Sequence, residues 1–301
     1  MDGYYRQNTL YPLPDEQGMA LRGQLKEGLR QKVSRYCWRL GDFKSNTFPL
    51  SSEAINPLHR PLWRIICNWL SVVPSPALGL HLRTAEFIPV LKYRLGLPVY
   101  SADGLCSACS MPNDRMGDHA LGCSKTGDRI ARHNMLRDVI FEAAAAADLG
   151  PTKEERHLLP GNSARPGDVM IRRWANGKDA AIDATVTSPL AASNVVGAAA
   201  KAGSALEKAC QRKLRDTAEA CRQEGLAFLP FAVETLGGLH AGAVTQVKQI
   251  AAALARKNGQ EEGVVTSQLF GRLSLNLMRG NALMLSSRCQ ADCPPHIDGI
   301  M

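Results

Sequence analysis

The chain of 301 residues has no apolar run approaching the roughly 18 residues of a membrane span, and its N-terminus lacks the basic and apolar segments of a secretory signal. No segment repeats at a fixed period, which argues against a solenoid or a propeller. Cysteine is present in an odd number, nine, and Cys37, Cys67, Cys210 and Cys221 have no obvious partners, so a complete disulfide framework is not expected. We therefore expect a protein of a reducing compartment, nucleus or cytoplasm, that is not secreted and has no membrane partner.

The bulk composition is that of an ordinary globular protein. Hydrophobic residues make up 45% of the chain and charged residues 21%, which is enough apolar material for a core. The length allows one large domain or two modest ones. Lysine and arginine exceed aspartate and glutamate by 36 to 28, and this excess modestly favours a polyanionic partner.

Hydrophobic periodicity predicts a mostly helical chain that is interrupted by a few strands. An Asn176-Gly177 pair between two short strand candidates predicts a β-hairpin. The predicted elements are helices up to about residue 100 (including 85–95), a helix at 128–148, the hairpin strands 168–171 and 180–186, a basic helix at 201–223, a strand at 226–233, and helices at 241–257 and 265–285. We accordingly divide the chain into a helical support region (1–100), a cysteine-containing segment (101–127), an α/β domain (128–285) and a loose tail (286–301).

Four metal-ligating residues, Cys106, Cys109, His119 and Cys123, lie within eighteen positions. A Cys-x2-Cys turn directs two thiolates to one point, and His119 and Cys123 are four residues apart, so they can share one helical face. Four protein ligands leave no position for a catalytic water, so the pattern predicts a structural zinc knuckle. The alternative is that these cysteines are simply buried. A second site at Cys289, Cys293 and His296 is not predicted, because it lacks a fourth ligand.

Acidic residues flank the predicted hairpin. Asp168 and Asp183 lie on its two strands, and antiparallel pairing would bring both to the same end of the sheet, with Glu154 as a third candidate. Convergent carboxylates suit Mg²⁺, and a lysine nearby, for which Lys213 is the candidate, would offset charge on a phosphate. The alternative is that each aspartate only caps or solvates a strand end.

The order of these motifs resembles the C-terminal part of site-specific non-LTR retrotransposon proteins. The matching segments are CSACSMPNDRMGDHALGC, ARHNMLRD, ARPGDV, AAIDATVTSPL and KACQRKLR, and the resemblance covers roughly residues 87–238, half of the chain. The resemblance implies an α/β fold with a restriction-endonuclease-like mixed sheet flanked by helices, preceded by a zinc knuckle and a helical N-terminal module. It also implies a metal-dependent endonuclease that nicks target DNA so that the exposed 3′ hydroxyl primes reverse transcription.

Roles are carried over by motif. The resemblance implies that Cys106, Cys109, His119 and Cys123 bind structural zinc, that Asp168 and Asp183 bind catalytic magnesium, and that Lys213 serves the active site. It assigns Arg132, His133 and Asn134 to the family's Arg-His-Asn signature. Two departures stand out: Gly167 is inserted between Pro166 and Asp168, and Asp183 is not followed by a lysine two residues later. Lys213 must therefore substitute from the next helix, with Lys208 and Lys201 as alternatives.

The remaining motifs leave competing interpretations open. Arg132, His133, Asn134 and Arg212 are candidates for binding nucleic acid, although a charged helix face is commonly only solvated. Trp38, Trp63 and Trp69 are expected in the core. No aromatic-x-Asp-Asp polymerase motif occurs, so we expect a reverse transcriptase domain to be supplied by another chain or lost by truncation. The leading hypothesis is a nuclease acting on duplex DNA, with element RNA as a second partner; the rivals are an inactive nucleic-acid-binding module and a protein-interaction module.

Overall fold

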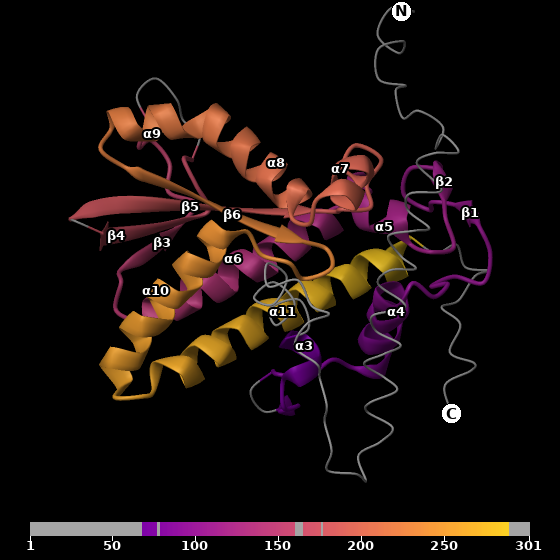
Figure 1. Cartoon of the computed structure of the whole chain (residues 1–301), viewed down its shortest axis with the longest axis horizontal. Helices are drawn as coiled ribbons and strands as arrows, with labels where there is room; N and C mark the ends of the chain where they lie inside the picture. The colour runs from indigo at the N-terminus through magenta and orange to yellow at the C-terminus, as the bar shows by residue number, and fades with distance from the viewer. Residues whose placement is uncertain (1–67, 77–78, 160–164, 176, 289–301) are drawn as a thin grey trace, which may run out of the picture.

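The computed structural model describes residues 68–76, 79–159, 165–175 and 177–288. They form a mixed α/β structure in which helices cover both faces of a central sheet, and a small two-stranded hairpin lies at one end (Figure 1). The mixed α/β class predicted from the sequence is therefore confirmed. The predictions for residues 1–67, including Trp38 and Trp63, and for Cys289, Cys293 and His296 lie outside the described residues.

The central sheet has the strand order β3-β4-β5-β6. β3 (Pro151–Lys153), β4 (Val169–Ala175) and β5 (Lys178–Thr187) pair with one another in antiparallel order, and β4 and β5 form the predicted hairpin. β6 (Ala227–Glu234) pairs with β5 in parallel, with Asp183 opposite Pro230. A parallel pair needs a crossover connection, and the helices between β5 and β6 provide it.

The two faces of the sheet are covered by different helices (Figure 1). α6 (Asp128–Ala146), α10 (Ala241–Asn258) and α11 (Glu262–Ser287) cover one face, and Ile182 and Ala184 of β5 pack into the main core there. The other face carries α8 (Ser204–Lys213), the π-helical turn η3 (Leu214–Ala218) and α9 (Glu219–Gln223), preceded by α7 (Val195–Ala200). Because alternate strand residues point to opposite faces, Asp183 lies on the α8 side.

The long helix α11 packs against α6 and α10, which cover the sheet, and joins them to the rest of the described chain. α4 (Thr84–Leu95) and α3 (Asn68–Ser71) pack against it, and Trp69, only 3% exposed, lies in the core as predicted. The main core runs without a break from Trp69 to Leu285, while the division into three folded parts stays a prediction.

Most predicted elements are present with shifted ends. The helices expected at 85–95, 128–148, 241–257 and 265–285 and the strand at 226–233 correspond to α4, α6, α10, α11 and β6. The basic helix starts at Ser204 rather than Lys201, because Lys201 to Gly203 leave the helical conformation. The tail was expected to be loose from residue 286, but α11 continues to Ser287 and Arg288 is fully buried. No helix among the described residues is long and apolar enough to cross a membrane.

Candidate metal centre and acidic site

The four predicted knuckle residues converge. Cys106 directly follows β1 (Gly104–Leu105), Cys109 lies in the turn before β2 (Pro112–Asn113), and the short helix α5 (Asp118–Gly122) carries His119 and ends at Cys123. The turn is closed by two backbone hydrogen bonds between Cys106 and residues 110 and 111. A tight hairpin and one helical turn therefore bring four ligands together from eighteen positions.

The ligand atoms have the spacing that a metal ion requires. One atom from each residue lies within 4.8 Å of all the others. The Sγ atoms of Cys106 and Cys123 are 3.9 Å apart, and Cys109 Sγ lies 3.3 Å from His119 Nε2. Tetrahedral zinc with Zn–S bonds of about 2.3 Å separates its sulfur ligands by roughly 3.8 Å. This Cys3His cluster could hold a metal ion, and its donor set is compatible with zinc.

Side chains from the segment around the cluster and from the end of α11 hold the cluster against this helix. Tyr100 Oη donates to Leu285 O at 2.6 Å, and Ser107 Oγ donates to Ser287 O at 2.9 Å. Arg288 reaches back from the end of α11 to the carboxylate of Asp128 and to Thr126 Oγ1. These contacts join segments more than 150 residues apart, and this explains why Arg288 is buried where a loose tail was expected.

Asp168 lies immediately before β4, where it is held from three directions. Its Oδ2 accepts hydrogen bonds from Ala184 N at 2.7 Å and from His133 Nε2 at 2.9 Å, and its own N–H donates to Ile182 O. The inserted Gly167 has a physical reason, because a Cβ there would lie 2.9 Å from Ile182 O. Close approach of the two backbones therefore requires glycine at this position.

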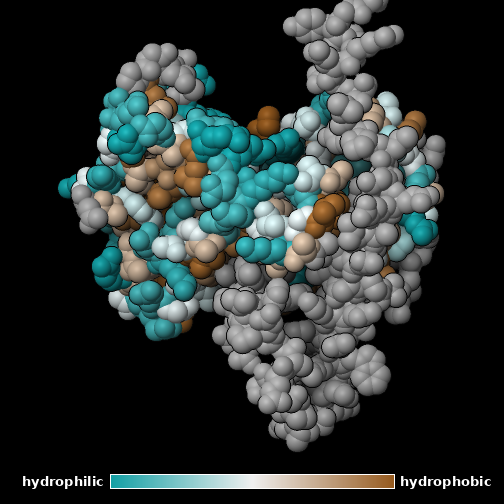
Figure 2. Space-filling model, turned by 45° about the horizontal axis from the view of Figure 1, so that its top comes forward, coloured by the Kyte–Doolittle hydropathy of each residue, from teal (hydrophilic) through white to brown (hydrophobic). Residues whose placement is uncertain are grey.

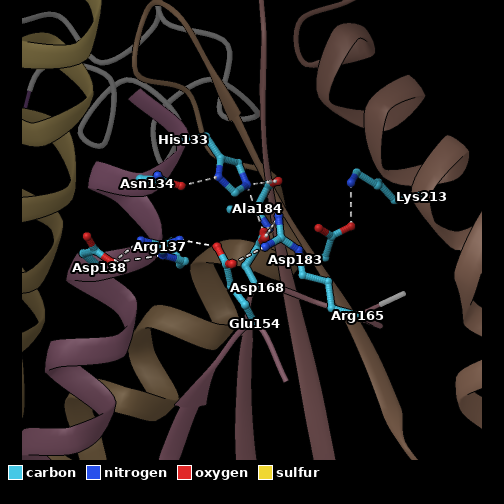
Figure 3. Close-up of polar contacts among 10 residues, drawn as sticks. All are labelled: His133, Asn134, Arg137, Asp138, Glu154, Arg165, Asp168, Asp183, Ala184 and Lys213. Carbon is cyan, nitrogen blue, oxygen red and sulfur yellow. Dashed lines mark hydrogen bonds and ion pairs between the residues drawn. The ribbon is translucent and has the colours of Figure 1, made fainter. Parts of the chain in front are cut away.

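Asp183 and Lys213 meet on the face of the sheet that carries α8 (Figure 3). Lys213 is the last residue of α8, and its Nζ lies 2.7 Å from Asp183 Oδ2. Lys208 instead donates to Ser193 O, and Lys201 lies before α8. The helix changes to π geometry directly after Lys213, and such π turns occur frequently at functional sites.

The two aspartates differ in proton affinity. Burial alone would raise the pKa of Asp168, but hydrogen bonds from His133 and Ala184 outweigh it, and the net shift is downward. Burial raises the pKa of Asp183, and the adjacent Asp168 carboxylate adds to this effect, while Lys213 opposes it. The two carboxylates are thus close enough to influence each other's ionisation, and Asp168 is the more readily ionised.

Glu154 adopts a different arrangement from the one predicted. Its N–H donates to Asp168 O, but its carboxylate forms ion pairs with Arg137 and Arg165. Among the described residues, the Cys3His cluster is the one place where three or more Cys, His, Asp or Glu side chains converge closely enough to share a metal ion. Glu154 therefore lies beside the aspartates without joining them as a third ligand in this structure.

Arg132 is placed in the core, away from any surface where nucleic acid could bind. It is 3% exposed and donates to Asn281 Oδ1 at 3.0 Å and to Leu121 O at 3.3 Å. Burial lowers its pKa to about 10. As α6 packs on α11, this guanidinium connects the two helices to the knuckle, so we correct its predicted role from binding nucleic acid to structure.

His133, the next residue, faces the acidic site. Besides Asp168, its Nε2 lies 3.1 Å from Ala184 O, and its Nδ1 lies 3.4 Å from Asn134 Oδ1. The hydrogen bond to Asp168 is the main cause that raises the pKa of His133. Arg137, which contacts Glu154 beside this site, was not singled out from the sequence. Its spacing of four residues from His133 places both residues on the same helix face and could have indicated it.

Arg212 lies on the exposed surface of α8. The face of the molecule that carries α8 and α9 is largely hydrophilic (Figure 2). The role of Arg212 in binding nucleic acid stays a prediction.

The sequence matches no protein-family model and no protein of curated function. The function of the acidic site is therefore argued from the residues that compose it.

Proposed function

We propose that this chain is a Mg²⁺-dependent DNA endonuclease with a restriction-endonuclease-like fold, in which Asp168 and Asp183 hold the metal and Lys213 serves the phosphate or the water. We also propose that Cys106, Cys109, His119 and Cys123 hold a structural zinc. The single observation that carries the nuclease proposal is the meeting of two adjacent carboxylates with a lysine amine 2.7 Å from one of them.

The chemistry of the donors supports magnesium. Carboxylate oxygens are the protein ligands that Mg²⁺ prefers, and bound Mg²⁺ supplies charge stabilisation and an activated water for phosphodiester hydrolysis. The ionised Asp168 is fixed by Ala184 N–H, so its orientation is set before a metal binds. The ammonium of Lys213 can shift from Asp183 to a phosphate oxygen and offset the charge that develops there.

The topology also supports the proposal. The resemblance implied a mixed sheet flanked by helices, with a lysine on the helix that follows the second aspartate. α6, the β3-β4-β5 meander, α8 and β6 follow each other in that order. Within this proposal, target DNA is the substrate, element RNA is a second partner, and a reverse transcriptase domain uses the nick.

Nicking of supercoiled plasmid in Mg²⁺ tests the proposal. We expect Asp183→Asn to reduce nicking at least about 100-fold, since it removes a metal ligand, and Lys213→Ala to reduce it more than Lys208→Ala on the same helix. Asp179→Asn is the matched control, because Asp179 lies on the same strand and is paired with Arg172. Equal nicking by wild type and Asp183→Asn would contradict the assignment.

A second candidate function is an inactive nucleic-acid-binding module. It is favoured by the absence of a lysine two residues after Asp183 and by the use of Glu154 in ion pairs with arginines. This function predicts retardation of DNA in a gel at low salt without Mg²⁺-dependent nicking by the wild type. A protein-interaction module would show neither retardation nor nicking.

A further inference from the structure

Two arginines lie beside Asp168 on a shared carboxylate (Figure 3). Arg137 comes from α6 and contacts Glu154 Oε1, while Arg165 comes from the segment before β4 and contacts Glu154 Oε2. Arg165 Nη2 also lies 3.8 Å from Asp168 Oδ1. Glu154 thus joins two guanidinium groups, and that of Arg165 lies beside Oδ1 of Asp168, the oxygen that Ala184 and His133 leave unused.

The arrangement differs from an ordinary surface ion pair. The side chain of Arg137 is only 12% exposed, and its Nε and Nη2 both lie 2.9 Å from Asp138 Oδ1. The side chains of Arg165 and Glu154 are 39% and 35% exposed, so this ion pair, which lies beside Asp168, is accessible to solvent. One guanidinium is therefore fixed, and the other is accessible.

Apart from His133, which contacts Asp168 itself, the formal charges in the ion pairs around Asp168 match one for one. The carboxylates of Asp138, Glu154, Asp168 and Asp183 face the cations of Lys153, Arg137, Arg165 and Lys213. A divalent cation bound at the two aspartates would leave a net positive charge. Anionic groups would then be attracted to the accessible guanidinium of Arg165.

We propose that Arg137 and Arg165, called here the arginine pair, bind a backbone phosphate of DNA beside Asp168, and that Glu154 holds the pair in place until the phosphate displaces it. Arginine binds phosphate through charge-assisted N–H donors, and each of these guanidinium groups already offers its Nη1 to one oxygen of the Glu154 carboxylate. This inference rests on the proposed function for its ligand, and it gives Glu154 a positioning role in place of metal binding.

Binding of a short DNA duplex, followed by fluorescence anisotropy across a salt series with and without a divalent metal, tests the arginine pair. We expect Arg165→Ala and Arg137→Ala each to weaken binding about tenfold, as for a lost charge-assisted contact. Each should also reduce the slope of log affinity against log salt by about one. Arg172→Ala is the matched control, because Arg172 is bound in the same way by Glu155 and Asp179 at the other end of β4.

A second substitution separates the two roles of Glu154. Glu154→Gln removes the competing carboxylate, so we expect DNA to bind several-fold more tightly than after Glu155→Gln, which changes the net charge equally. We also expect slower Mg²⁺-dependent nicking, because the guanidinium groups lose their fixed orientation. Should Arg137→Ala fail to fold, Arg137→Lys tests the same contact, with the salt slope kept and the affinity reduced.

The outcomes separate this inference from the nuclease proposal. Losses of affinity no larger for Arg137→Ala and Arg165→Ala than for Arg172→Ala would overturn the arginine pair, even if the wild type nicks DNA. Glu154→Gln binding DNA no more tightly than Glu155→Gln would overturn the positioning role. If DNA binding depends on the two arginines but the wild type never nicks DNA, the phosphate-binding role of the arginine pair would stand and the nuclease proposal would be refuted.

Discussion

Glu234 is the last residue of β6, and its carboxyl group is enclosed by the turn that follows. Its N–H donates to Gly238 O at 2.7 Å, and a Cβ at Gly238 would lie 2.8 Å from Glu234 Oε2. Burial raises its pKa to about 7. Within the described part of the chain, no cation or hydrogen-bond donor offsets this burial, so the folded protein stabilises the protonated acid.

The sign of the resulting pH dependence follows from the two states. The pKa of about 7 in the folded protein exceeds the ordinary value of 4.5, so the folded state binds the proton more tightly. The free energy of unfolding therefore falls as pH rises from about 4.5 to about 7 and is level above that. A difference of about 2.5 pKa units corresponds to about 3 kcal/mol as an upper value, because the side chain is not fully buried.

Glu234→Gln tests this estimate. The variant has no titrating group, so we expect it to gain up to about 2.5 kcal/mol in stability relative to wild type between pH 5 and pH 8. Urea denaturation followed by tryptophan fluorescence, with wild type and variant compared at each pH and with zinc in excess, measures the difference. Glu224→Gln, an exposed acid beyond α9, is the control. An equal stability difference at both pH values would refute the reasoning.

Two further predictions concern packing and metal binding. Gly280→Ala would place a Cβ 2.6 Å from Cβ and 2.9 Å from Cα of Arg132. We therefore expect the free energy of unfolding, measured by heat or urea, to fall by at least about 1–3 kcal/mol. Gly127→Ala is the control and should change stability little, because a Cβ there meets no atom within 4 Å. Cys109→Ser should lower the zinc content, measured by elemental analysis, below one ion per chain and should reduce the melting temperature. Cys210→Ser, outside the cluster, should retain the zinc. Equal zinc content in the two variants would contradict the assignment of the cluster.

The features that the sequence predicted well are local. The hairpin followed from an Asn-Gly pair, and the cysteine cluster followed from spacing, because in each case residues near in sequence decide the geometry. Helix ends moved by only a few residues. Lys213 was named as the lysine near the aspartates, but its ion pair with Asp183, thirty residues earlier, was not predicted.

The features that the sequence did not predict depend on packing between distant segments. Arg132 is buried because α6 meets α11 at Gly280, a contact that no local pattern encodes. Glu154 had the right charge for a metal ligand, but arginines from two other segments take its oxygens. The same applies to Arg288, whose buried position depends on Asp128, 160 residues earlier.

The anchoring of the cysteine cluster on α11 has a consequence for folding during synthesis. Residues 99–123 leave the ribosome long before residues 262–288, which include Leu285, the acceptor for Tyr100. Until then the cluster has no surface to dock on, so contacts of very long sequence separation must form last. A metal ion held early by the cluster would keep this small segment folded until α11 is made, and would then affect the kinetics of folding as well as the final stability.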